Sequence, residues 1–337
     1  MDIQIIATLG PGSLNLDTVK KMEENGVTLF RLNLSHTLLE DIDPLVRQIQ
    51  SWTDIPLCLD SEGAQVRNNK MISERVFFKE GDSVKIHHNY VLGDDKNISF
   101  TPDTVSRKIK VGDKIKVDFN SVCFCVTKDN KSHLLAVVEK SGYVGSNKAS
   151  DIDSDIYLDA ITKKDKSAFI IGLGLGIKHF SLSFTNRAQD VIDLRKIIGN
   201  EAIIISKIES IKGVLNLNEI LPIVDQILID RGDLSREVDI AKIPFLQRKI
   251  ISSSQSFNTP VYVATNLLES MIKSNSPTRA EVNDIASTLL MGATGLVLAA
   301  ETAIGEYPVD SVKMAKSLIK QFEKWTPESS SNDIIYD

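Results

Sequence analysis

The sequence is poor in cysteine and contains no long apolar run. Its 337 residues include 3 cysteines, which are too few for a disulfide framework and are not spaced as zinc ligands. No apolar stretch approaches the ~20 residues that span a bilayer. The first residues, MDIQIIATLGPGS, lack the basic region and the cleavage site of a signal peptide. We therefore expect a protein of the reducing cytoplasm that has no membrane partner.

The chain also has few basic residues relative to acidic ones. It carries 39 Lys and Arg against 45 Asp and Glu, a formal net charge of −6, which argues against nucleic acid as the main partner. Residues 66–150 are the exception, because they hold 15 basic and 10 acidic residues. This basic segment is either a solvated surface or a flap that covers an anionic ligand.

Short apolar runs rich in β-branched residues recur along the chain and alternate with stretches of helical pattern. This alternation indicates parallel βαβ units, and eight such units close into a (β/α)8 barrel. The expected strands are residues 3–8, 28–33, 55–60, 178–184, 202–207, 226–230, 260–265 and 295–300. The expected helices are residues 16–25, 162–171, 190–199, 212–221, 279–291 and 311–325, followed by a frayed end at 326–337.

The interval between the third and fourth expected strands has a different character. β-branched and aromatic runs at 84–88, 108–119, 122–128 and 134–138 are separated by glycine–aspartate pairs typical of turns. The pattern predicts a small all-β domain inserted after the third strand. We expect the barrel to comprise residues 1–65 and 146–337, and the inserted lid domain to comprise residues 66–145.

Charged residues collect where the expected strands end, which is where a (β/α)8 barrel carries its active site. They include Arg31, Asp60, Lys207, Glu209 and Asp233. Carboxylates beside basic groups suit a divalent metal and an anionic, oxygen-rich substrate. They are typical of phosphoryl or carboxylate chemistry. A structural cluster of ion pairs is the alternative.

An ordered set of motifs resembles the pyruvate kinase family over nearly the whole chain. The motifs are ATLGP from residue 7, RLNLSH from 31, LDSEGAQVR from 59, SKIES from 206, DRGDL from 230, ATNLLESM from 264, PTRAE from 277 and ETAIGEYP from 301. The resemblance implies a barrel with a β-domain inserted after strand three. It also implies transfer of the phosphoryl group of phosphoenolpyruvate to ADP, which gives pyruvate and ATP.

The resemblance assigns catalytic and substrate-binding roles residue by residue. Lys207 would neutralise the phosphoryl group in flight, and Arg31 would grip the phosphate as a bidentate guanidinium can. Thr265 would lie near the methylene carbon, where its hydroxyl could relay a proton. The Gly232 backbone N–H would face the substrate carboxylate.

Metal and nucleotide sites are implied in the same way. Glu209 and Asp233 would hold the Mg²⁺ or Mn²⁺ ion that also binds substrate oxygens. K⁺ would bind the hard oxygen donors of Asn33, Ser35, Asp60 and Ser61. Nucleotide phosphates would meet His36, Arg67 and Lys148, and the last two flank the basic insert, in agreement with a closing lid.

The sequence departs from the family at several positions. Glu62 reverses a charge at the mouth of the site, and Gln65 replaces a residue that is Glu in K⁺-dependent members and Lys in independent ones. Ala300 replaces a Ser whose hydroxyl has been assigned a part in the proton relay. Family members usually continue into a regulatory α/β domain. The resemblance therefore predicts a short form without that domain, and leaves open a homodimer through the barrel.

Three functions stay open on the sequence. The first is a minimal pyruvate kinase, which the intact set of Lys207, Glu209, Asp233, Arg31 and Thr265 favours. The second is a diverged enzyme that acts on phosphoenolpyruvate, pyruvate or another 2-oxo acid without phosphorylating ADP. The third is a non-catalytic paralogue that keeps the barrel for ligand binding.

Overall fold

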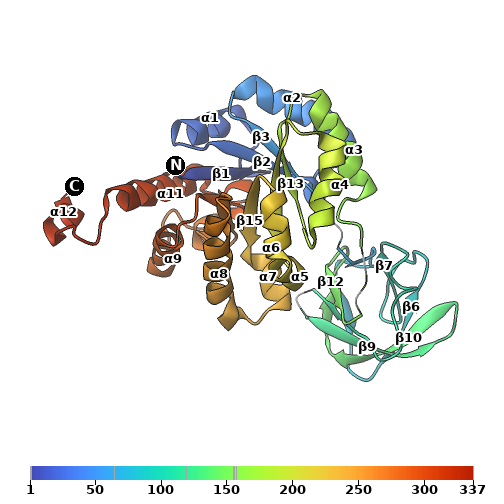
Figure 1. Ribbon diagram of the computed structural model, residues 1–337. Coiled ribbons are helices and arrows are strands. Elements are labelled where there is room, and N and C mark those ends of the chain that lie inside the picture. The colour runs from blue at the N-terminus through green and yellow to red at the C-terminus, as the bar shows by residue number, and fades with distance from the viewer. Residues whose placement is uncertain (1, 64, 119, 155, 157, 337) are drawn as a thin grey trace. The chain divides into compact units, whose positions relative to one another are not determined.

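Eight parallel strands close into a barrel in the computed structural model (Figure 1), which describes residues 2–63, 65–118, 120–154, 156 and 158–336. The strands are β1 (Gln4–Leu9), β2 (Leu29–Asn33), β3 (Leu57–Asp60), β13 (His179–Leu182), β14 (Ile203–Ile208), β15 (Gln226–Asp230), β16 (Val261–Ala264) and β17 (Gly295–Leu298). Each expected strand is confirmed to within two residues at either end. The sheet closes where β1 pairs with β17.

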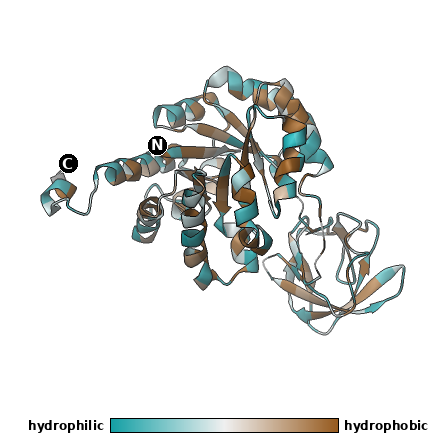
Figure 2. Ribbon diagram, in the orientation of Figure 1, coloured by the Kyte–Doolittle hydropathy of each residue, from teal (hydrophilic) through white to brown (hydrophobic). Residues whose placement is uncertain are grey.

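The barrel strands are mainly apolar, with charged residues near their carboxyl ends, because both of their faces are buried. Successive side chains of a strand point to opposite faces, so Ile5 and Ala7 join the layer under the helices, whereas Ile6 joins the barrel interior. Figure 2 shows these strands as largely hydrophobic, surrounded by helices with one hydrophilic side. The two cores explain why short β-branched runs identified the strands so well.

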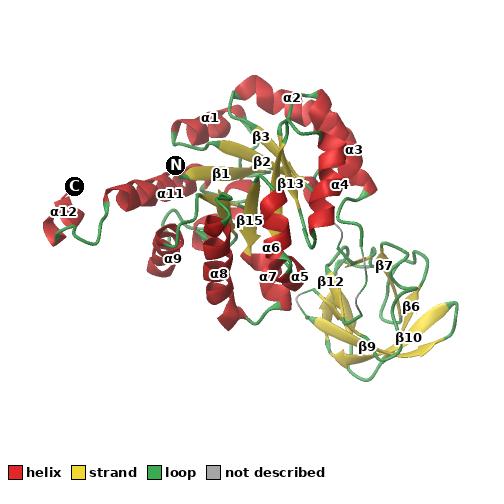
Figure 3. Cartoon of the chain, in the orientation of Figure 1, coloured by secondary structure: helices red, strands yellow, loops and turns green. Residues whose placement is uncertain are grey.

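Helices follow the barrel strands (Figure 3). They are α1 (Leu16–Glu24), α2 (Ile42–Trp52), α3 (Lys163–Gly174), α4 (Ala188–Ile198), α5 (Ile211–Leu215), α6 (Leu217–Ile220), α7 (Arg231–Glu237), α8 (Ile243–Ser256), α9 (Arg279–Leu290), α10 (Ala300–Ala303), α11 (Pro308–Lys324) and α12 (Ser331–Tyr336). Five short 3₁₀ turns also occur among the described residues: η1 (Leu34–His36), η2 (Leu39–Asp41), η3 (Leu221–Ile223), η4 (Ile240–Lys242) and η5 (Glu269–Ile272).

Five of the six expected helices are confirmed, and their start signals are visible. Thr278 accepts a hydrogen bond from the backbone of Glu281, whose side chain bonds back to the backbone of Thr278, so a capping box begins α9. The expected helix at 212–221 is instead broken at Asn216, whose side chain donates to the Asn186 carbonyl at 2.8 Å. Within the end that was expected to fray, residues Ser331–Tyr336 form α12, and Ser330 and Asp333 exchange capping hydrogen bonds at its start.

The inserted domain is a compact unit of residues 64–159 with its own apolar core. Its larger sheet runs in the order β12-β8-β9-β10-β6-β7-β4, and β11 pairs with β5 in a second sheet. The strands are β4 (Arg67–Asn68), β5 (Val76–Phe78), β6 (Ser83–His87), β7 (Asn97–Thr101), β8 (Lys114–Val117), β9 (Val122–Asp129), β10 (His133–Lys140), β11 (Gly142–Val144) and β12 (Ser150–Ile152).

Two details of the insert differ from the expectation. The expected run at 108–119 shortens to β8 because a turn precedes it, in which the Lys110 N–H donates to the Asp113 carboxylate at 2.7 Å. The chain returns to the barrel at residue 160 rather than at 146, since β12 pairs with β8 in the sheet of the insert. Across the described residues, no helix has the length and apolarity needed to cross a bilayer.

Candidate active site

Lys207 lies among carboxylates at the carboxyl ends of the barrel strands. It belongs to β14, and its Nζ lies 3.1 Å from Glu209 Oε2, 3.5 Å from Asp230 Oδ2 and 3.8 Å from Asp60 Oδ2. The ammonium also donates to Ser183 Oγ at 3.2 Å. Burial disfavours its charge, but the attraction of Asp60, Glu209 and Asp230 outweighs burial and raises the pKa of Lys207. The side chain is therefore a permanent buried cation.

Arg31 supplies a second cation from β2, which is separated from β14 by β3 and β13 in the barrel. Its Nε donates to Thr8 Oγ1 at 2.9 Å, and its Nη1 lies 3.3 Å from Asp60 Oδ2. Nη1 is buried and forms no hydrogen bond within the described chain. A buried donor that lacks an acceptor is costly, so this guanidinium is poised for an anion.

Three carboxylates form a cluster beside Lys207. One oxygen from each of Glu209, Asp230 and Asp233 lies within 4.8 Å of the other two. Burial is the main cause that raises the pKa of Glu209 and of Asp233, and the neighbouring carboxylates raise both further. Among the described residues, Glu209 Oε2 and Asp230 Oδ1 accept no hydrogen bond. Hard carboxylate oxygens in this arrangement fit Mg²⁺ or Mn²⁺.

Thr265 has an unusual backbone at the end of β16. Its φ is +70°, and that of the following Asn266 is +55°, although a β-branched residue avoids positive φ. Arg231 holds this conformation, since its guanidinium donates twice to the Thr265 carbonyl, at 3.2 and 2.6 Å. The arrangement places Thr265 Oγ1 2.8 Å from the Gly232 N–H, from which it accepts a hydrogen bond.

Comparison with known proteins identifies the family that carries this site. The model of the pyruvate kinase barrel domain matches residues 1–312. The chain belongs to the pyruvate kinase family.

Curated members of the pyruvate kinase family are similar along almost the whole chain. The pyruvate kinase of Thermotoga maritima is 31% identical over 95% of this chain and 71% of its own length. Those of Geobacillus stearothermophilus and Lactobacillus delbrueckii subsp. bulgaricus are 31% and 32% identical over 95% of this chain. This chain spans 57% of the length of each of these two relatives.

The K⁺ set that the pyruvate kinase resemblance implied lies at the ends of β2 and β3. Asn33 Oδ1 accepts from the Ser35 N–H at 2.9 Å, and Ser61 Oγ accepts from the Ser183 N–H at 2.8 Å. Asp60 is 1% exposed, and its Oδ1 accepts no hydrogen bond from any described residue. An orphaned carboxylate oxygen among hydroxyl and amide oxygens fits a hard monovalent cation.

The residues expected at the nucleotide lie in both compact units. Within the insert, Arg67 and Lys148 come from paired segments, because Arg67 bridges Ala149 and its guanidinium donates to the Asn147 carbonyl at 3.1 Å. Lys148 Nζ lies 3.7 Å from Asp118 Oδ2. His36 is an exposed residue at the end of η1 in the barrel unit.

Glu62, which reverses the usual charge in the pyruvate kinase family, has a partner in the barrel unit. Its Oε2 lies 3.2 Å from Lys164 Nζ, which also donates to the Leu34 carbonyl at 2.6 Å. Next to this pair, the Asp165 carboxylate accepts from the N–H groups of Glu62 and Gly63 at 2.7 and 3.2 Å. The charge reversal is thus accommodated by an ion pair beside a fixed loop. Ala64, in the same motif, lies outside the described residues.

Two residues of the site escaped the sequence analysis. The DRGDL motif contains both Asp230 and Asp233, but of these two acids only Asp233 was expected to be a metal ligand. Ser183 follows β13 and bonds both Lys207 and Ser61, and no motif pointed to it. Arg231 Nη1 lies 2.6 Å from Asp284 Oδ2, and Arg236 Nη1 lies 3.2 Å from Asp233 Oδ1.

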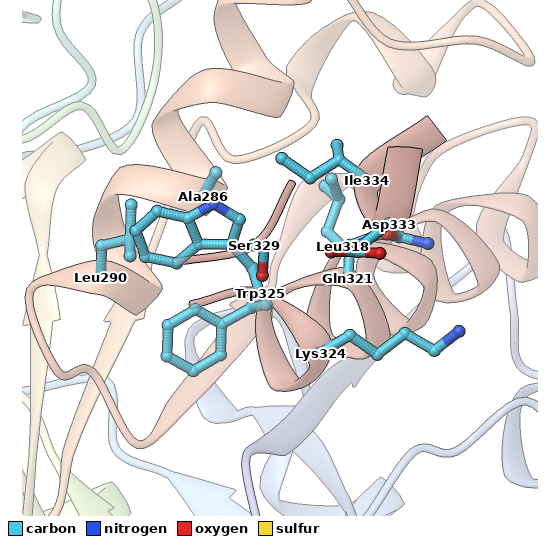
Figure 4. A pocket seen from close by; sticks show the side chains of 10 residues that line it. Ala286, Leu290, Leu318, Gln321, Lys324, Trp325, Ser329, Asp333 and Ile334 are labelled. Carbon is cyan, nitrogen blue, oxygen red and sulfur yellow. The ribbon is translucent and has the colours of Figure 1, made fainter. Parts of the chain in front are cut away.

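A separate pocket lies where α9 and α11 meet the C-terminal segment (Figure 4). Its lining is mainly apolar and includes none of the residues of the candidate active site. The lining residues are Ala286, Leu290, Leu318, Gln321, Phe322, Lys324, Trp325, Ser329, Asp333 and Ile334.

Proposed function

We propose that this chain transfers the phosphoryl group of phosphoenolpyruvate to ADP. The bond between phosphorus and the enol oxygen breaks, a bond to a β-phosphate oxygen of ADP forms, and the enolate takes up a proton at its methylene carbon to give pyruvate. The observation that carries the proposal is the buried Lys207, held as a cation beside three clustered carboxylates. Such a fixed charge stabilises the charge that develops on a transferring phosphoryl group.

In this proposal, the cations and the polar groups contact different parts of the substrate. Lys207 and Arg31 neutralise the phosphoryl oxygens, and Arg31 Nη1 is a buried donor that has no hydrogen-bond acceptor among the described residues. The Gly232 backbone N–H faces the substrate carboxylate in this proposal, and the absence of a side chain at this residue leaves the approach to that N–H open. The Thr265 hydroxyl passes a proton toward the methylene carbon in this proposal.

Glu209 and Asp233 hold Mg²⁺ or Mn²⁺ in this proposal, with Asp233 also close to the substrate. The metal ion, when bound, neutralises charge on the substrate oxygens as a Lewis acid. Asn33, Ser35, Asp60 and Ser61 provide oxygen donors for K⁺, and the orphaned Asp60 Oδ1 supports this assignment.

The proposal also covers nucleotide binding, the location in the cell and the oligomeric state. His36, Arg67 and Lys148 meet the phosphates of ADP or ATP, since each can donate to a phosphate oxygen. A cytoplasmic location fits the free thiols of the three cysteines. A homodimer through the barrel stays a prediction, which sedimentation of the purified chain would test.

The test is direct formation of ATP and pyruvate from phosphoenolpyruvate, ADP and Mg²⁺, with and without K⁺. Lys207→Met should lower kcat by about 10³-fold or more and leave the far-UV spectrum unchanged. Lys249→Met, which removes an exposed lysine from α8, is the matched control and should keep full activity. Absence of both products at high enzyme concentration would refute the proposal. Stabilisation by pyruvate and metal without ADP turnover would instead support the diverged enzyme.

A further inference from the structure

The side chain of Asp230 is buried in the site, although it forms no hydrogen bond that caps the helix after it. Asp230 is the residue before α7, where an aspartate usually caps the helix through its side chain, yet this side chain forms no capping hydrogen bond. It is 6% exposed, and its Oδ1 accepts no hydrogen bond from the described residues. A buried carboxylate oxygen without a partner carries a large desolvation cost, so the free protein does not explain this residue.

Among the described residues, the acidic side chains around Lys207 outnumber the basic ones that pair with them. Three ion pairs match the other acids of the site, and these pairs are Arg31–Asp60 at 3.3 Å, Lys207–Glu209 at 3.1 Å and Arg236–Asp233 at 3.2 Å. The ion pair of Asp230 is with the same Lys207, at 3.5 Å. Asp230 is thus the surplus carboxylate of the cluster.

The orphaned oxygen of Asp230 lies beside Gly232, which has no side chain. The position that a Cβ of Gly232 would take lies 3.5 Å from Asp230 Oδ1, so the glycine leaves the space beside this oxygen unfilled. Glu209 Oε2, another carboxylate oxygen of the cluster, likewise accepts no hydrogen bond in the described chain. Asp230 and Asp233 stand three residues apart across the start of α7, which brings their side chains to one side.

We infer that Asp230 is a third carboxylate ligand of the divalent metal, beside Glu209 and Asp233, and that it raises the affinity of the free protein for Mg²⁺ or Mn²⁺. The inference rests on the metal site of the proposed function and adds a ligand to it. A third carboxylate oxygen without a hydrogen bond adds both a donor atom and negative charge to the site.

The test is Mn²⁺ binding to the full chain without substrate or nucleotide, measured by electron paramagnetic resonance of the free ion at fixed pH and ionic strength. Asp230→Asn should weaken Mn²⁺ binding by about tenfold or more, and Asp230→Glu should restore most of the affinity. Asp193→Asn removes the same charge from α4, where Asp193 pairs with Lys196 on the surface, and should bind Mn²⁺ as the wild type does.

Wild-type affinity in Asp230→Asn would overturn the inference, as would a wild-type protein that binds Mn²⁺ only after phosphoenolpyruvate is added. Because a buried substitution can harm folding, Asp230→Ser is measured beside it, and each variant is first shown to unfold cooperatively in urea. Either folded variant decides the outcome. ATP formation is assayed separately, since binding that depends on Asp230 without turnover would refute the proposed function and leave this inference intact.

Discussion

The Asp165 carboxylate ties the end of β3 to the start of α3, and its removal should destabilise the barrel measurably. The side chain is 0% exposed. It accepts from the N–H groups of Glu62, Gly63 and Thr162 at 2.7, 3.2 and 3.1 Å, and from Thr162 Oγ1 at 2.8 Å. Asp165→Ala leaves three backbone N–H groups without this acceptor, at about 1 kcal/mol or more each. We expect a loss of about 3 kcal/mol in the free energy of unfolding.

Asp165→Asn should cost less, about 1–2 kcal/mol, because the amide keeps one acceptor oxygen but turns a donor toward the other N–H groups. The assay is urea unfolding followed by tryptophan fluorescence. The chain has 2 tryptophans, Trp52 and Trp325, and both belong to the barrel unit, so the signal reports that unit. The control is Asp43→Asn, which breaks the surface pair with Arg47 in α2 and should change stability by no more than about 0.5 kcal/mol. Equal stability of Asp165→Ala and the control would refute the reasoning.

Two further predictions concern the loop after β16. Arg231→Met removes both donors to the Thr265 carbonyl. We expect steady-state kinetics to show kcat lowered about tenfold or more, with a smaller change in KM. Arg231→Lys should recover part of the loss, whereas a variant with only a raised KM would contradict the positioning role. Although partial burial opposes it, hydrogen bonds from Ser270 and Thr278 hold the pKa of Glu281 below its usual value. Its stabilisation is therefore full above the unfolded pKa of about 4.3 and is lost as the pH falls through the lowered folded pKa. Urea unfolding should show the wild type more stable than Glu281→Gln at pH 7 by about 1 kcal/mol, with the gap closing in acid, and a gap independent of pH would exclude this account.

The barrel could be predicted from sequence because its strands are buried on both faces and its loops are short. Lys207 and Glu209 were predictable for a related reason, since a strand end in a barrel fixes where its last side chains meet. The break at Asn216 was not, because a side-chain hydrogen bond to the distant Asn186 ends that helix. The late return of the insert depends on the pairing of β12 with β8, which local patterns do not report.

The role of Asp230 was hidden by its neighbour Asp233. Both acids stand in one motif, and the sequence gives no account of which carboxylate already has a cation. That distinction needs the distances to Lys207 and Arg236. The positive φ of Thr265 was equally inaccessible, because threonine is a residue that local propensity keeps out of that region.

The left-handed backbone at Thr265 and Asn266 sets stability against activity at a single position. Asparagine tolerates φ of +55° at Asn266, but threonine at +70° costs of order 1–3 kcal/mol. Selection for stability alone would replace Thr265 with glycine or asparagine, and either change would remove the hydroxyl that bonds Gly232. Designers who seek a more thermostable form of this barrel should therefore leave this strained residue alone and look for gains elsewhere in the fold.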